Sequence, residues 1–234
     1  MTAAPAFPPL LHGSHVPRDP FAGACARAAE GVDSGLVAYD VTRECLRAAM
    51  VFAPEVALRD AVVMLPLCGV AFQNAFGALA PPEVAVHLDW DGGLRLNGAV
   101  AGRLRMAVGH DHGGRPPGGT FEEDAVPPWL VVGLDLTLFD PATDPGATPD
   151  CTTLADEGCA DLDPVHLLES WARHTLLWTR RWEDEGLRPL HAEWIGLAHG
   201  LGETFTGVDE RFGRLARECG ATRLTPLTAL LERP

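Results

Sequence analysis

The stretch HLDWDGGLRLNGAVAGRLRM, residues 87–106, carries two tight-turn signals between runs of alternating apolar and polar residues. The first signal is Asp-Gly-Gly at 91–93. The second is Asn-Gly at 97–98, the dipeptide most typical of a two-residue hairpin. The stretch therefore predicts three consecutive antiparallel strands joined by short turns. The expected strands cover 83–90, 94–96 and 100–108.

The flanking sequence adds helices and further strands. Asp19-Pro20 and Asp163-Pro164 each supply an N-cap residue followed by a proline that suits a first helical turn. Pro66 interrupts a segment that is apolar on nearly all faces, so two helical pieces are expected there. The expected helices cover 21–30, 56–79 and 164–186, and the other expected strands cover 35–39, 48–52 and 129–138.

The C-terminal part has a different pattern. Three short strand-like runs, at 203–208, 214–217 and 222–227, are separated by glycine or acidic turns. The fold class predicted is α+β: a mixed β-sheet with flanking helices in residues 1–197, followed by a small β module in residues 198–234.

The chain contains no lysine, and all 18 of its basic residues are arginine. A Walker-A phosphate loop needs a lysine, and so does a Schiff-base enzyme, so both classes are excluded. The protein also cannot accept a biotinyl or lipoyl group on a lysine of its own. Arginine does not replace lysine where chemistry needs a compact ammonium group.

The net charge of −14 argues against nucleic acids and membrane surfaces as partners, because both attract basic proteins. No apolar run approaches the roughly 20 residues of a membrane span, and the first twenty residues lack a signal-peptide pattern. Six cysteines without a CxxC pair are typical of reduced thiols. A cytoplasmic location is therefore expected.

Four segments in order carry a resemblance to a known family: 87–106, 129–138, 152–171 and 202–215. The first is similar to the ligase pattern KWPND, strand, NGKKxAG, strand, and the second to a strand that usually runs IGIGINV. The chain thereby resembles the biotin/lipoate protein ligase superfamily, which comprises biotin protein ligases, lipoate protein ligases and lipoyl/octanoyl transferases. The residues that fall on family positions are Trp90, Asn97, Gly98, Ala101, Gly102, Gly133 and Thr137.

The resemblance implies a sheet of the class II synthetase type followed by an SH3-like module. It also implies a pocket for a small carboxylic acid of the biotin, lipoate or octanoate type, ATP-Mg as co-substrate, an acyl-adenylate, and a biotinyl or lipoyl carrier domain as acceptor. The implied ligand-binding residues are Trp90, Asn97, Gly98, Gly102, Gly133 and Thr137, with Arg43, Arg47 or Arg103 supplying positive charge. A homodimer is left open.

Several residues depart from the ligase pattern. In this resemblance the catalytic lysine falls on Ala99 or into a one-residue gap beside it, and the segment 39–50 lacks the glycines and most of the length of the Arg/Gly-rich loop. Asp135 occupies the second glycine of the IGIGINV-like strand, where its carboxylate would lie close to a nucleotide phosphate. These departures predict the loss of standard ATP-dependent ligation.

Two residues are candidates for a remaining catalytic role. Cys151 follows the strand at 129–138, close to the place where lipoyl/octanoyl transferases carry a nucleophilic cysteine. Its acidic neighbour Asp150 favours the neutral thiol, and the lysine partner is missing. Arg103 and Arg105 share a strand face, with Ala101 expected beside them and Gly102 opposite, and such a pair can bind a carboxylate. Solvated surface arginines are the simpler interpretation.

No metal site is predicted. His110-Asp111-His112 lies in a glycine-rich loop, and such a loop holds zinc poorly without ligands from rigid elements. His87, Asp89 and Asp91 alternate along one expected strand, which is weak evidence for a cation. Two hypotheses for function follow: an acid-binding ligase or transferase relative, or a non-catalytic sensor or docking module for a biotinylated or lipoylated carrier. Whether the chain is an enzyme is not decided by its residues.

Overall fold

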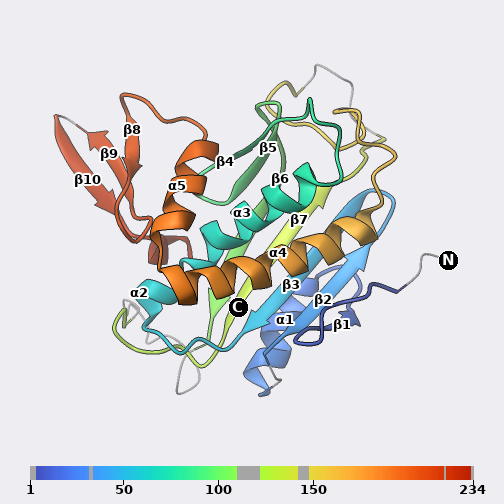
Figure 1. Cartoon of the computed structure of the whole chain (residues 1–234), viewed down its shortest axis with the longest axis horizontal. Helices are drawn as coiled ribbons and strands as arrows, with labels where there is room; N and C mark the ends of the chain where they lie inside the picture. The colour runs from blue at the N-terminus through green and yellow to red at the C-terminus, as the bar shows by residue number, and fades with distance from the viewer. Residues whose placement is uncertain (1–3, 32–33, 110–121, 142–147, 219, 233–234) are drawn as a thin grey trace.

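The computed structural model describes residues 4–31, 34–109, 122–141, 148–218 and 220–232. A seven-stranded sheet with the order β1-β2-β3-β7-β6-β5-β4 forms its centre (Figure 1). The strand β1 runs parallel to β2 and the other neighbours are antiparallel, so the sheet is mixed, as predicted. The strands are β1 (His12–His15), β2 (Leu36–Val41), β3 (Cys45–Phe52), β4 (Val86–Leu88), β5 (Gly93–Leu96), β6 (Ala99–Val108) and β7 (Leu130–Thr137).

Both turns of the central stretch are confirmed. Asn97 and Gly98 have φ angles of +49° and +96°, which is the pair of positive values that a type I′ hairpin needs. Gly92 has φ +95° in the first turn, where a Cβ would lie 2.3 Å from the Leu104 carbonyl oxygen. Only glycine therefore fits the position at 92, and the turn joins β4 to β5 while the Gly92 carbonyl oxygen accepts a hydrogen bond from Leu104 N–H of β6.

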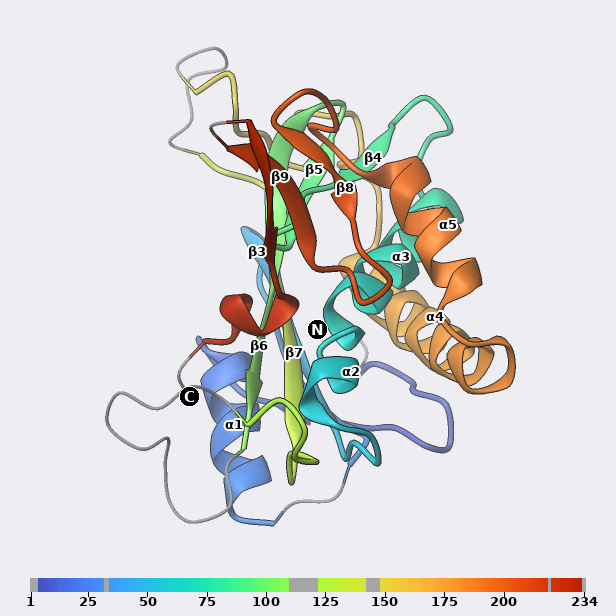
Figure 2. The same ribbon diagram turned by 90° about the vertical axis from the view of Figure 1, so that its left-hand side faces the viewer.

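Helices cover the two faces of the sheet unequally, as Figure 2 shows along its edge. On one face α3 and α4 pack together, and their core includes Phe72, Phe76 and Trp171, each fully buried. On the other face α1 packs against β2, β3 and β7. The helices are α1 (Pro20–Ala29), α2 (Leu58–Ala61), α3 (Met64–Gly77), α4 (Pro164–Glu185) and α5 (Arg188–Leu197).

The apolar segment does split into two helices, but the break lies at Val62 and Val63 rather than at Pro66. Pro66 sits in the first turn of α3, where its missing N–H removes no intrahelical hydrogen bond. By length and composition alone the segment Leu58–Gly77 could cross a membrane, yet 78% of its apolar window is buried inside the protein. The helix α5 was not expected from the sequence.

A three-stranded antiparallel sheet forms the small C-terminal module. It consists of β8 (Phe205–Val208), β9 (Arg214–Glu218) and β10 (Ala221–Thr225), followed by the 3₁₀ helix η1 (Leu227–Leu230). This arrangement confirms the predicted fold class, a mixed sheet with flanking helices plus a small β module. The domain division at 197/198 and the SH3-like character of the module stay predictions.

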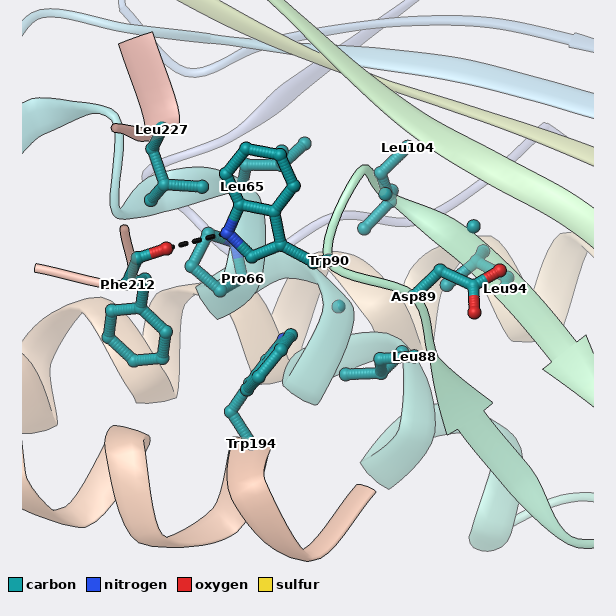
Figure 3. Close-up of a pocket in the computed structure, with 13 residues that line it drawn as sticks. Leu65, Pro66, Leu88, Asp89, Trp90, Leu94, Leu104, Trp194, Phe212 and Leu227 are labelled. Carbon is teal, nitrogen blue, oxygen red and sulfur yellow. Dashed lines mark hydrogen bonds between the residues drawn. The ribbon is translucent and has the colours of Figure 1, made fainter. Parts of the chain in front are cut away.

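Trp90 joins the module to the sheet (Figure 3). Its indole N–H donates a hydrogen bond of 2.7 Å to the Phe212 carbonyl oxygen. The fully buried Phe212 ring in turn meets Trp194 of α5 edge-on, with the ring centroids 5.9 Å apart. Trp90 therefore contacts the C-terminal module through Phe212, and Phe212 contacts α5 through Trp194.

Gly133 lets α1 approach β7. A Cβ at this position would lie 2.6 Å from Phe21 Cδ2, so Gly133→Ala must push α1 away from the sheet. We expect the substitution to lower the free energy of unfolding by about 1–3 kcal/mol, as for an overpacked core, in urea titrations. Gly196→Ala is the matched control, because Gly196 lies in α5 with open space around it and alanine favours a helix. Equal stability of the two variants would contradict this account of the packing.

Candidate functional site

A cavity of about 500 Å³ lies over the part of the sheet that α1 leaves uncovered. Its floor carries side chains from three strands: Cys45 and Arg47 on β3, Asp135 and Thr137 on β7, and Arg103 on β6. These positions alternate with core residues such as Leu46, Leu104 and Leu136, which pack on the α3 side. The wall comes from the segment after β7 and is lined by Asp140, Thr148, Cys151, Thr152 and Thr153.

A row of alternating charges crosses the sheet at the cavity floor. Strand register places Asp40, Arg47, Asp135 and Arg103 side by side on β2, β3, β7 and β6. Arg47 Nε lies 3.6 Å from Asp135 Oδ1, and these side chains are 40% and 30% exposed. The two charges compensate each other yet still face the cavity, so both remain available to a ligand.

Arg105 lies one row further along β6 and is more enclosed. Its Nε is 3.2 Å from Asp135 Oδ2, an ion-pair contact that lacks hydrogen-bond alignment. Its guanidinium carbon stands 4.2 Å above the centre of the Phe21 ring, a cation–π geometry. Asp135 is thus held between two arginines, which fixes its carboxylate at the boundary between the cavity and α1.

Five of the residues that the sequence analysis proposed line the cavity together. They are Arg47, Gly102, Arg103, Thr137 and Cys151. A Cβ at Gly102 would lie 2.4 Å from the Asp135 carbonyl oxygen, so glycine lets β6 and β7 stay paired beneath the cavity. Cys151 is placed by a β-bridge to Val100, flanked by hydrogen bonds from Val100 N–H to Asp150 O and from Thr152 N–H to Val100 O.

The other five proposed ligand residues lie elsewhere. Trp90 contacts the C-terminal module, and Gly133 lies under Phe21. Asn97 and Gly98 form the hairpin turn, where the Asn97 amide donates to Glu157 Oε2 at 2.6 Å. Arg43 is exposed between β2 and β3, with its guanidinium 5.1 Å from the centre of the Phe139 ring.

The sequence analysis missed Cys45 and most of the wall. Cys45 lies two residues before Arg47 on β3, so strand alternation could have placed it on the same face. Ala101 was expected beside Arg103 and Arg105. It does line the cavity with Arg103, but it is buried and also belongs to the larger core, next to a β-bulge that shifts the register at Leu94/Arg95. The threonines of the wall carry no comparable signal in the sequence.

The thiols of the described residues divide into buried and accessible groups. Burial raises the pKa of Cys25 to about 12, and it also raises the pKa values of Cys68 and Cys159. These three are therefore neutral at physiological pH. Cys45 is half-buried and Cys151 is exposed, and both line the cavity as free thiols.

Within the described part of the chain, no group of three or more His, Cys, Asp and Glu side chains is arranged to hold a metal ion. The His110-Asp111-His112 motif lies outside the described residues. Asp89 accepts hydrogen bonds from Arg95 Nε at 2.8 and 2.9 Å and has His199 Nδ1 at 3.1 Å. This carboxylate therefore joins β4 to β5 and to the residue that follows α5.

Solved structures share this fold. A crystal structure of a biotin protein ligase-like protein of unknown function from Silicibacter sp. TM1040 is 52% identical, with a TM-score of 0.88 over 98% of this chain and 100% of that one. The apo biotin protein ligase from Aquifex aeolicus is 14% identical, with a TM-score of 0.68 over 92% of this chain and 93% of that one. The same enzyme in complex with biotin and ATP has a TM-score of 0.63 at 14% identity, over 92% and 94% of the two chains.

Models of sequence families divide the chain at nearly the point where the small module begins. A domain of unknown function, DUF4444, matches residues 197–233, whereas none of the curated proteins matches the sequence. The biotin/lipoate A/B protein ligase family matches residues 7–196, which include the whole seven-stranded sheet and its helices. The chain therefore belongs to the biotin/lipoate A/B protein ligase family.

Proposed function

We propose that this protein binds a small monocarboxylic acid of the biotin, lipoate or octanoate type in the cavity above Arg47, Asp135 and Arg103. The observation that carries the proposal is the cavity itself, which lies over the open sheet face and has two arginines at its floor. A guanidinium group binds a carboxylate with two parallel hydrogen bonds. Membership of a family whose solved relatives include a complex with biotin supports the same ligand class.

We further propose that ATP-dependent ligation is lost. Adenylation brings a carboxylate against the α-phosphate of ATP, so the two anions need cationic cover. Arg47 and Arg103 in the cavity lining are balanced by Asp135 and Asp140, and the catalytic lysine of the family is replaced by Ala99. The residues present do not fit a magnesium triphosphate. A ligand sensor is the role that these features favour.

A second candidate function is acyl transfer through Cys151, and the observation that favours it is the position of an accessible thiol in the cavity wall. In such a step the thiolate attacks the acyl carbonyl of a thioester donor, and the donor thiolate leaves. An amine of the acceptor then displaces Cys151 from the acyl group. The two steps need no ATP, which agrees with the departures from the ligase pattern.

The first test is binding of octanoate, biotin and lipoate, measured by calorimetry. We expect a saturable signal with at least one acid, and Arg103→Ala should weaken it by roughly 10- to 100-fold, because a charge-assisted hydrogen bond from the cavity floor is lost. Arg180→Ala is the matched control: Arg180 is 81% exposed on α4 and pairs only with Asp184 among the described residues. Equal weakening in both variants, or no binding of any acid, would argue against this use of the cavity.

The second test concerns the nucleotide. We expect ATP-Mg to give no saturable heat, alone or with a bound acid, and no pyrophosphate to be released, since the site lacks net positive charge. Pyrophosphate release that depends on the acid would instead establish adenylation and end the sensor hypothesis.

The third test separates transfer from sensing. If Cys151 is a nucleophile, incubation with an octanoyl thioester adds one octanoyl group to the protein, which intact-mass spectrometry detects. Cys151→Ser should abolish this adduct, whereas Cys159→Ser should keep it, because Cys159 is buried and neutral. An unmodified wild-type protein would leave sensing as the remaining function.

A further inference from the structure

The C-terminal tail returns from the small module to the main sheet. After η1, Leu231 forms a parallel β-bridge with Met106, and the Glu232 N–H donates to the Met106 carbonyl oxygen at 2.9 Å. The strand β5 pairs with β6 only as far as Arg103, so beyond that point the edge of β6 is open to the tail. The tail thereby brings Glu232 next to Arg103 and Arg105.

The Glu232 carboxylate contacts both of these arginines, which we call the arginine pair. Arg103 Nη2 donates to Glu232 Oε1 at 3.0 Å, and Arg105 Nη1 lies 3.6 Å from Glu232 Oε2. Each carboxylate oxygen thus has its own guanidinium partner. Arg103 also lines the ligand cavity, so one residue belongs to both the cavity floor and the contact with the tail.

Direct contacts join the pair to a network of three arginines and three carboxylates. Asp135 contacts Arg47 and Arg105, and Asp19, the N-cap of α1, accepts a hydrogen bond from Arg105 Nη2 at 3.2 Å. Asp19 and Asp135 are held by a helix terminus and by the central sheet. Glu232 is the third carboxylate and comes from the tail. Without it, two carboxylates of this network, Asp19 and Asp135, remain in contact with its guanidinium groups, and Arg103 loses the carboxylate that it contacts.

We propose that the arginine pair is the binding site for the ligand's carboxylate and that Glu232 occupies it from within the chain. This inference rests on the proposed function. A ligand carboxylate then enters by replacing the Glu232 carboxylate, so Glu232 determines which ligands bind. A free monocarboxylate can make the exchange. An amide, such as the linkage of an acyl group to a carrier lysine, is uncharged. It therefore cannot replace the Glu232 carboxylate as the partner of the arginine pair.

The ligand class follows from this exchange. The protein selects the free acid over its amide-linked form, because only the acid supplies a negative charge in place of the displaced Glu232 carboxylate. The exchange replaces one negative charge by another, so a polyanion such as a triphosphate is disfavoured at the same position. The tail of the small module thereby takes part in ligand choice, although the cavity belongs to the main sheet.

The test compares octanoate with octanamide in the full-length protein. Glu232→Gln removes the internal competitor, so the affinity for octanoate should rise roughly five- to tenfold, while octanamide should bind weakly and equally to both forms. Glu218→Gln is the matched control, since it removes the same charge from the same module, where Glu218 pairs with Arg223 on the surface. In the background of Arg103→Ala the gain from Glu232→Gln should largely disappear.

The possible results distinguish a failure of the Glu232 exchange from a failure of the proposed acid binding. If wild-type protein binds octanoate and Glu232→Gln binds it no more tightly, the exchange is wrong and acid binding stands. If octanamide gains affinity as much as octanoate does, the role of charge is wrong. If neither the wild-type protein nor Glu232→Gln binds an acid, both the proposed function and this inference are wrong. Glu232→Ala and a thermal melt of each variant check that any change comes from the contact and not from unfolding.

Discussion

Strand β7 pairs with a neighbour on each side along its length, and the alternation of its side chains governs both halves of the molecule. Val132, Leu134 and Leu136 point toward α3 and α4 and build the larger core. Gly133 and Asp135 lie on the opposite face of the strand. Gly133 leaves space for α1 to pack, and Asp135 lies between Arg47 and Arg105. A shift of one residue in this strand would exchange the core for the cavity floor.

The charge pattern supports the proposal that this site does not activate a carboxylate with a nucleotide. Every arginine at or beside the floor already has a carboxylate partner: Arg47 and Arg105 contact Asp135, and Arg103 contacts Glu232. Such a site exchanges one anion for another and gains little from an added polyanion. Ala99 carries no charge and Asp135 carries a negative one, so neither residue supplies the positive potential that a triphosphate needs.

The sequence was a good guide where local chemistry alone decides the structure. Asn97 and Gly98 specify a turn by their backbone preferences, and Asp163 with Pro164 begins α4 whatever the surroundings. The site was harder to predict, because it depends on contacts between distant segments. No local pattern predicts that the Trp90 indole binds the Phe212 carbonyl, that a bulge interrupts the pairing of β5 with β6, or that Glu232 returns to Arg103. Half of the ten proposed site residues, Cys151 included, therefore line the cavity, and the other five lie in turns or packing contacts elsewhere.

The contact between Phe21 and Gly133 has a consequence for the size of any bound molecule. The Phe21 ring is 5% exposed and fills the sheet face directly beside the charged row, with Arg105 above it. A molecule on this face therefore cannot extend past the row of Arg47 and Asp135 toward α1. In the proposed complex the carboxylate lies at Arg103 and Arg105, next to Phe21, so the acyl chain has room only in the other direction, across the cavity.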